Sequence, residues 1–140
     1  MKADRPPPRS ILCSTLLVVT TIAVGLMLRF VPVGLPVTLT KYGGSMLWAA
    51  MIYWIVSSVL RRWSFARAGL LSLAAATSVE LFQLYHAAPL DAFRRTLPGA
   101  LLLGRVFSTL DLVAYAVAIG CAVMVDRAIR GASLYWRGSR

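Results

Sequence analysis

Two acidic residues, Glu80 and Asp111, lie inside otherwise apolar stretches of this 140-residue chain. Each has a polar neighbour on its own helical face, because Gln83 follows Glu80 by three positions and Tyr115 follows Asp111 by four. Ionisable groups are costly within a membrane span, so they usually face the interior of a helix bundle and serve a function. We therefore predict a polar cluster of Glu80, Gln83, Asp111 and Tyr115 that binds a ligand or exchanges protons.

Basic residues are expected to complete this site. Four of them are predicted to lie beside the polar cluster as partners for a phosphate or for the two acids: Arg29, Lys41, Arg94 and Arg105. Both basic residue types bind phosphate through charge-assisted hydrogen bonds. The same residues allow a structural alternative, in which Glu80 and Asp111 form buried ion pairs with Arg29 and Arg105 that hold the helices together.

The sequence contains none of the common catalytic or metal-binding motifs. There is no H-E-x-x-H, no nucleophile–base pair and no phosphate-binding glycine loop. The two cysteines, Cys13 and Cys121, lack the spacing of metal ligands, and the single histidine, His86, is expected at a helix end. We therefore expect no cofactor and no metal, and the sequence favours a protein without enzymatic activity.

The composition is typical of a membrane protein. Hydrophobic residues make up 59% of the chain and charged residues 14%, against usual values of about 45–50% and about 25%. Mean hydropathy is +0.73. The net charge of +10 arises from 15 Lys and Arg against five acids. These basic residues flank the apolar runs and do not form one patch, which indicates membrane topology and excludes a nucleic-acid partner.

The apolar runs predict an all-α fold, a four-helix transmembrane bundle. The helices are expected at about 11–31, 44–60, 68–86 and 106–125. The link at 87–105, which mixes charged and apolar residues, could form a short re-entrant or interfacial helix between the third and fourth helices. The predicted domains are a disordered basic cytoplasmic tail at 1–10, a single transmembrane domain at 11–129 and a basic cytoplasmic tail at 130–140.

The distribution of Lys and Arg among the loops predicts the orientation, because cytoplasmic loops carry more of them. One side collects Lys2, Arg5, Arg9, Arg61, Arg62, Arg67, Arg127, Arg130, Arg137 and Arg140, and the other only Arg29, Lys41, Arg94, Arg95 and Arg105. Both termini are therefore predicted to be cytoplasmic. Counted from that surface at ~1.5 Å per residue, Glu80 lies ~18 Å and Asp111 ~21 Å into the membrane, in its outer half.

Five segments resemble a known family. They are KYGGSMLWA at 41–49, SVELFQLY at 78–85, LDAFR at 90–94, LGRVFS at 103–108 and DLVAY at 111–115. In combination they are similar to an uncharacterised family of bacterial integral membrane proteins, the domain-of-unknown-function 2809 family. The resemblance covers roughly residues 28–119.

A more distant resemblance is to the VanZ-like family, whose members are associated with glycopeptide (teicoplanin) resistance. It is carried by E-x-x-Q at Glu80, a following Arg, and the Asp that opens the last helix; Tyr115 stands where VanZ-like proteins tend to have Asn. Together the resemblances imply a four- or five-helix protein at the bacterial cell envelope, which we place in the cytoplasmic (inner) membrane as a multi-pass protein.

The function that these patterns favour is a cell-envelope module. It would bind an anionic lipid or a lipid-linked precursor through the polar cluster, with the basic residues on the phosphate. The alternatives are a membrane enzyme acting on such a lipid, a purely structural ion-pair network, and a small transporter subunit. The expected partners are membrane lipids, and a transporter role would require an oligomer.

Overall fold

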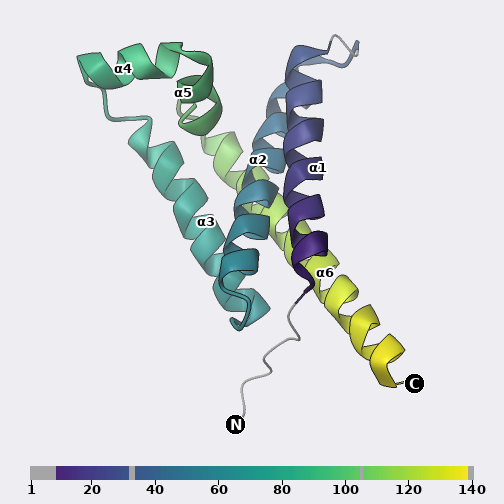
Figure 1. The fold of residues 1–140 in the computed structure, drawn as a ribbon. Helices are drawn as coiled ribbons and strands as arrows, with labels where there is room; N and C mark the ends of the chain where they lie inside the picture. The colour runs from purple at the N-terminus through teal and green to yellow at the C-terminus, as the bar shows by residue number, and fades with distance from the viewer. Residues whose placement is uncertain (1–8, 32–33, 105, 139–140) are drawn as a thin grey trace.

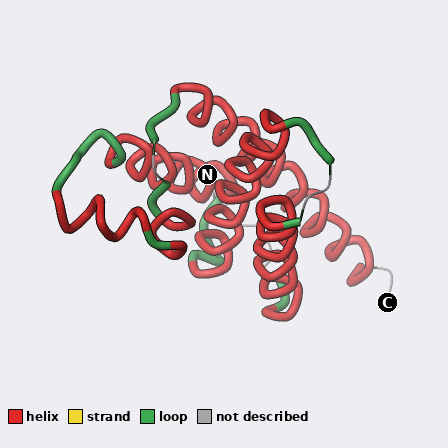
Figure 2. Tube along the Cα trace, turned by 90° about the horizontal axis from the view of Figure 1, so that it is seen from above, coloured by secondary structure: helices red, strands yellow, loops and turns green. Residues whose placement is uncertain are grey.

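The computed structural model describes residues 9–31, 34–104 and 106–138, and the side chains of residues up to 132. The described residues form six helices and no strand (Figures 1 and 2): α1 Ile11–Phe30, α2 Val37–Val59, α3 Phe65–Phe82, α4 Ala88–Arg95, α5 Leu97–Leu102 and α6 Thr109–Gly138. The all-α prediction is confirmed.

Helix α2 is the centre of the bundle. It packs against α1, α3 and α6, and α3 also packs against α6. The core around it consists of small and aromatic side chains, among them Ala49, Tyr53 and Ala76, each 0% exposed. At the crossing of α3 and α6, a Cβ at Gly69 would lie 3.2 Å from the Val123 side chain, so the glycine allows the two backbones to approach closely.

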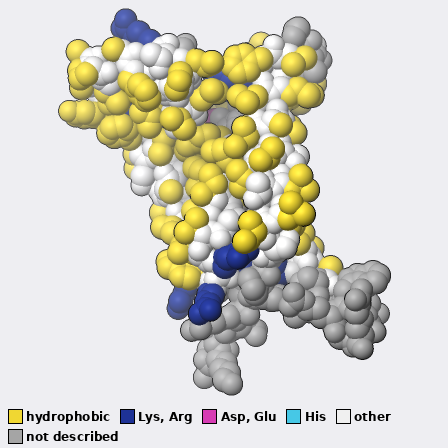
Figure 3. Space-filling model, in the orientation of Figure 1, with side chains coloured by type: hydrophobic (Ala, Val, Ile, Leu, Met, Phe, Trp, Pro, Cys, Tyr) yellow, Lys and Arg dark blue, Asp and Glu magenta, His cyan; other side chains and the backbone are white. Residues whose placement is uncertain are grey.

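Three helices are long and apolar enough to cross a membrane, counted over the part of the chain that the structure describes: α1, α3, and α6 over Thr109–Ala132. Helix α1 buries only Ser14, and most of its large hydrophobic side chains are exposed. Hydrophobic side chains are spread over the visible flank of the molecule (Figure 3). A soluble protein rarely exposes so much contiguous apolar surface, so the chain is a membrane protein. A crossing by the 23-residue α2 stays a prediction.

The link between α3 and α6 folds as two short helices. Figure 1 shows α4 lying across one end of the bundle and α5 turning back toward the long helices. Thr96 joins the two, since it ends α4 and its hydroxyl accepts a hydrogen bond from the Gly99 N–H at 3.2 Å. Gly99 is required at this corner because a Cβ would lie 2.0 Å from the Phe93 carbonyl oxygen.

Several predicted boundaries are wrong. Helix α2 begins at Val37 and not at residue 44, because Pro36 stands at its N-cap and the polar residues that follow it belong to the first helical turns. Helix α3 spans Phe65–Phe82 and not 68–86, because the Ser64 hydroxyl accepts from the Arg67 N–H and so caps the helix earlier. At its other end, the chain leaves the helix in a turn after Phe82.

The last helix and the predicted tails also differ from the sequence prediction. Helix α6 begins at Thr109 and continues to Gly138, so most of the predicted tail at 130–140 is helical. Its charged residues after Val125 do not stop it, since Asp and Arg are tolerated in a helix. At the other end of the chain, Arg9 is buried and Ser10 caps α1, whereas both were assigned to a disordered tail. Residues 1–8 of that tail lie outside the described residues.

Candidate functional site

Glu80, on α3, is the centre of a hydrogen-bonded cluster. Its side chain is 1% exposed. The Oε2 atom accepts hydrogen bonds from the Tyr115 hydroxyl at 2.7 Å and from the Gln83 amide at 3.0 Å, and Oε1 accepts from the Ser108 backbone N–H at 2.7 Å. The structure thus brings together Glu80, Gln83 and Tyr115. We call these three residues and Asp111 the Glu80 cluster.

Asp111 lies in the first turn of α6 and was predicted to join this cluster. A carboxylate in this turn is favoured by the helix dipole and often accepts the backbone N–H of the residue that precedes the helix. Here that residue is Ser108, and its N–H is donated to Glu80. The Oδ1 atom of Asp111 is therefore buried without a hydrogen-bond partner among the described residues.

Gln83 presents a second buried acceptor. Its Nε2 atom donates to Glu80, which fixes the orientation of the amide because a flip would place two acceptors against each other. The Oε1 atom then points elsewhere, and it too is buried with no partner in the described part of the chain. Gly104 makes room for this amide: its φ is +68°, and a Cβ would lie 2.5 Å from Gln83 Nε2.

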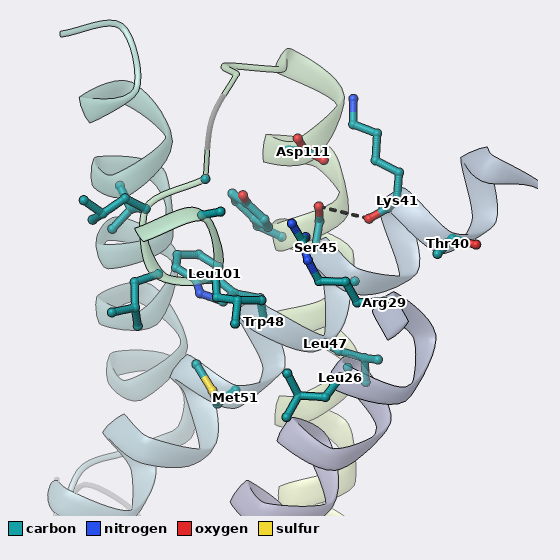
Figure 4. A pocket seen from close by; sticks show the side chains of 18 of the residues that line it. Leu26, Arg29, Thr40, Lys41, Ser45, Leu47, Trp48, Met51, Leu101 and Asp111 are labelled. Atoms are coloured by element: carbon teal, nitrogen blue, oxygen red, sulfur yellow. Dashed lines mark hydrogen bonds between the residues drawn. The ribbon is translucent and has the colours of Figure 1, made fainter. Parts of the chain in front are cut away.

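The cluster lies on the wall of a cavity of about 750 Å³. Figure 3 shows a hollow on the flank of the molecule near the end that carries α4, and Figure 4 shows the cavity from close by. Polar and aromatic side chains that line it come from α1, α2, α3, the turn after α3, and α6: Arg29, Lys41, Trp48, Glu80, Gln83, Asp111 and Tyr115. Leu26, Leu47, Met51 and Leu101 contribute apolar walls.

Two of the predicted basic partners reach this cavity. Arg29 extends from α1 into it, and Lys41, on α2, points past Asp111 toward the end of the bundle (Figure 4). The backbone of α5 contacts α4 but comes near neither α1 nor α2 among the described helices, so the cavity separates α5 from them. A cationic group and buried acceptors therefore share one partly apolar space.

Arg94 has a different role from the one predicted. Its side chain is buried but does not line the cavity. It donates to the backbone carbonyls of Phe82 at 2.7 Å and Tyr85 at 2.8 Å, and to Asp91 Oδ1 at 3.3 Å. It thereby satisfies the carbonyl end of α3 and fixes α4 there. The structure therefore does not bring Arg94 to this cavity, and Arg105 lies outside the described residues.

A second buried polar cluster lies at the opposite end of the bundle and was not predicted. Asp126, on α6, is 0% exposed and accepts from Arg9 Nη1 at 3.0 Å, Arg130 Nε at 2.8 Å and the Tyr53 hydroxyl at 2.9 Å. Arg9 also donates to Ser57 at 2.8 Å. Burial lowers the pKa of the Arg9 guanidinium, and the negative charge of Asp126 opposes that shift. We call Arg9, Tyr53, Asp126 and Arg130 the Asp126 cluster.

The Asp126 cluster is a buried ion-pair network, but of other residues than the pairing of Glu80 and Asp111 with Arg29 and Arg105 that the sequence allowed. Within the described residues, the carboxylate of Glu80 is held by neutral donors, whereas Asp126 is held by two guanidinium groups. One sequence signal could have revealed it: Asp126 and Arg130 are four residues apart and therefore share a helical face.

These features define a helical membrane protein with a cavity between its helices that is largely apolar and carries a few polar side chains. Residues 35–121 match the model of the family described as "Protein of unknown function (DUF2809)", and the chain belongs to that family. The matched region contains the whole Glu80 cluster and Lys41 but excludes Arg9, Asp126 and Arg130. No solved structure matches the chain. The VanZ-like relationship stays a prediction.

Proposed function

We propose that the cavity binds the headgroup of a membrane lipid or a lipid-linked cell-envelope precursor, whose anionic phosphate meets Arg29 and Lys41. The observation that carries the proposal is the cavity itself, about 750 Å³ in volume, with two basic side chains on a largely apolar wall. Ligand pockets of this size are usually apolar with a few polar groups that orient the ligand.

The place of the cavity on the surface favours a lipid over a water-soluble ligand. The hollow opens on a flank that is covered by hydrophobic side chains (Figure 3). A ligand that enters there must have an apolar part, because that flank faces lipid. Its polar part would reach Arg29, which extends into the cavity (Figure 4). An amphipathic molecule with a charged head satisfies both requirements.

The proposal includes the topology expected from the sequence. Figure 1 shows the beginning of α1 and the end of α6 at the same end of the molecule, opposite α4. With α2 as a fourth crossing and with both termini cytoplasmic, the cavity faces the outer leaflet of a bacterial inner membrane.

Native mass spectrometry of the purified protein tests the proposal. We expect phospholipid to stay bound through detergent exchange, and Arg29→Gln combined with Lys41→Gln to reduce its occupancy. Each lost charge-assisted hydrogen bond is worth about 1.5–3 kcal/mol, which is roughly ten- to hundredfold in Kd. The matched control is Arg62→Gln, because Arg62 is exposed in the turn after α2 and does not line the cavity.

Two results would contradict the proposal. One is a wild-type protein that retains no phospholipid after mild extraction. The other is equal retention by the double variant and by Arg62→Gln, which would show that the bound lipid is held elsewhere on the apolar surface.

An enzymatic function has less support. Both carboxylate oxygens of Glu80 are occupied by donors from the protein, so this residue is better placed to join α3 to α6 than to transfer a proton to a substrate. Among the described residues that line the cavity, Asp111 is the acid that has a carboxylate oxygen without a hydrogen-bond partner. We therefore propose binding without catalysis.

A further inference from the structure

We propose that the headgroup bound in the cavity carries a primary ammonium beside its phosphate, as a phosphoethanolamine group does. This inference rests on the proposed function and narrows it to one class of headgroup. It is carried by the two buried acceptors of the Glu80 cluster that lack a hydrogen-bond partner within the described residues, Asp111 Oδ1 and Gln83 Oε1.

Both acceptors are built into the fold and are not accidents of side-chain placement. Asp111 and Gln83 are each only 6% exposed, and both line the cavity. Glu80 takes the Ser108 N–H that would otherwise serve Asp111, and it also fixes which end of the Gln83 amide stays free. A buried acceptor without a partner costs about 1–3 kcal/mol, so a bound donor would be favoured at both positions.

The negative charge of the Glu80 cluster favours a cationic hydrogen-bond donor over a neutral one. Asp111 and Glu80 both line the cavity, and the donors to Glu80 are a hydroxyl, an amide and a backbone N–H. No described Lys or Arg forms a salt bridge with either acid. A primary ammonium has three N–H donors and one positive charge, so it can donate to more than one acceptor and offset the carboxylate charge.

The remaining groups fit the rest of such a headgroup. Arg29 extends into the same cavity and would meet the phosphate (Figure 4). The cavity therefore holds both free acceptors and a cationic group, the two kinds of group that a zwitterionic aminophosphate requires. A trimethylated headgroup keeps the charge but has no N–H donor, and a glycerol headgroup has hydroxyl donors but no charge.

Binding of three short-chain lipids to the full-length protein in detergent tests this inference. The probes are dioctanoyl phosphatidylethanolamine, phosphatidylcholine and phosphatidylglycerol, which share their acyl chains and phosphate. We expect the wild-type protein to bind the ethanolamine lipid at least about tenfold more tightly than the choline lipid, which is the effect of one hydrogen bond to a charged group. Asp111→Asn should abolish this preference, and Arg29→Gln should weaken the binding of all three lipids.

The outcomes separate the inference from the proposed function. Equal affinity for the ethanolamine and choline lipids would overturn the ammonium site and leave phosphate binding intact. Preference for the glycerol lipid would overturn it in favour of an anionic headgroup. Binding of none of the three would overturn the proposed function as well. The comparison of lipids on the wild-type protein needs no variant, so it decides the matter even where Asp111→Asn fails to fold.

Discussion

Replacing Asp126 by Asn should remove a large share of the stability of the bundle. The carboxylate accepts from Arg9, Arg130 and Tyr53 at 2.8–3.0 Å and is 0% exposed. The amide of Asn has nearly the same shape, so the substitution removes charge without leaving a cavity. The buried guanidinium groups of Arg9 and Arg130 then lose the negative charge of Asp126, and loss of one partner of a buried ion pair costs about 3–5 kcal/mol.

This loss is measurable as the free energy of unfolding in mixed micelles, with SDS as the denaturant and tryptophan fluorescence as the readout. A total stability of about 5–15 kcal/mol is usual, so a loss of this size should shift the transition clearly. The matched control is Asp91→Asn. Asp91 is about one-third exposed, and its partner Arg94 keeps two backbone carbonyl acceptors, so we expect a loss below about 1 kcal/mol.

A double-mutant cycle makes the test specific to the ion pair. Arg9→Gln combined with Asp126→Asn should cost less than the sum of the single losses, with a coupling of at least about 1 kcal/mol. If Asp126→Asn costs no more than Asp91→Asn, or if the cycle shows no coupling, the Asp126 cluster does not hold the first helix to the last and our reasoning is refuted.

Three further substitutions test the Glu80 cluster and its supports. Gly104→Ala should destabilise the protein by roughly 1–3 kcal/mol, because its positive φ is strained for alanine, and the new Cβ would collide with Gln83; thermal unfolding in detergent measures this. Tyr115→Phe removes the hydroxyl donor to Glu80 and should cost about 1–3 kcal/mol in the same assay, and an unchanged midpoint would contradict the hydrogen bond. Arg94→Ala should expose the link between α3 and α6 to limited proteolysis, because it removes the donor to two carbonyls, and an unchanged cleavage pattern would contradict that role.

The pairing of α3 with α6 was predictable because of helical geometry. The depth of Glu80 and Asp111 could be counted along two neighbouring helices from a common boundary, and the positions of Gln83 and Tyr115 followed from helical spacing. The structure places all four on one cavity wall. Their functional role stays a prediction, as does the cytoplasmic placement of the termini.

Other features could not be predicted because they depend on contacts between distant residues. Arg9 follows three prolines and is locally typical of a solvated tail, and only the packing of α2 against α6 provides Tyr53 and Asp126 for it. Arg94 was predicted as a phosphate ligand because its positive charge can be read from the sequence. The backbone carbonyls of Phe82 and Tyr85 that accept its hydrogen bonds cannot be read from the sequence, because they depend on where α3 ends.

A density map of the protein in lipid nanodiscs, with a bound antibody fragment to allow alignment, tests the lipid site most directly. We predict a phospholipid headgroup in the cavity, with its phosphate within about 4 Å of the Arg29 guanidinium, the range of a salt bridge. A cavity that is filled only by water or by acyl chains, with Arg29 turned away from it, would contradict the proposed function.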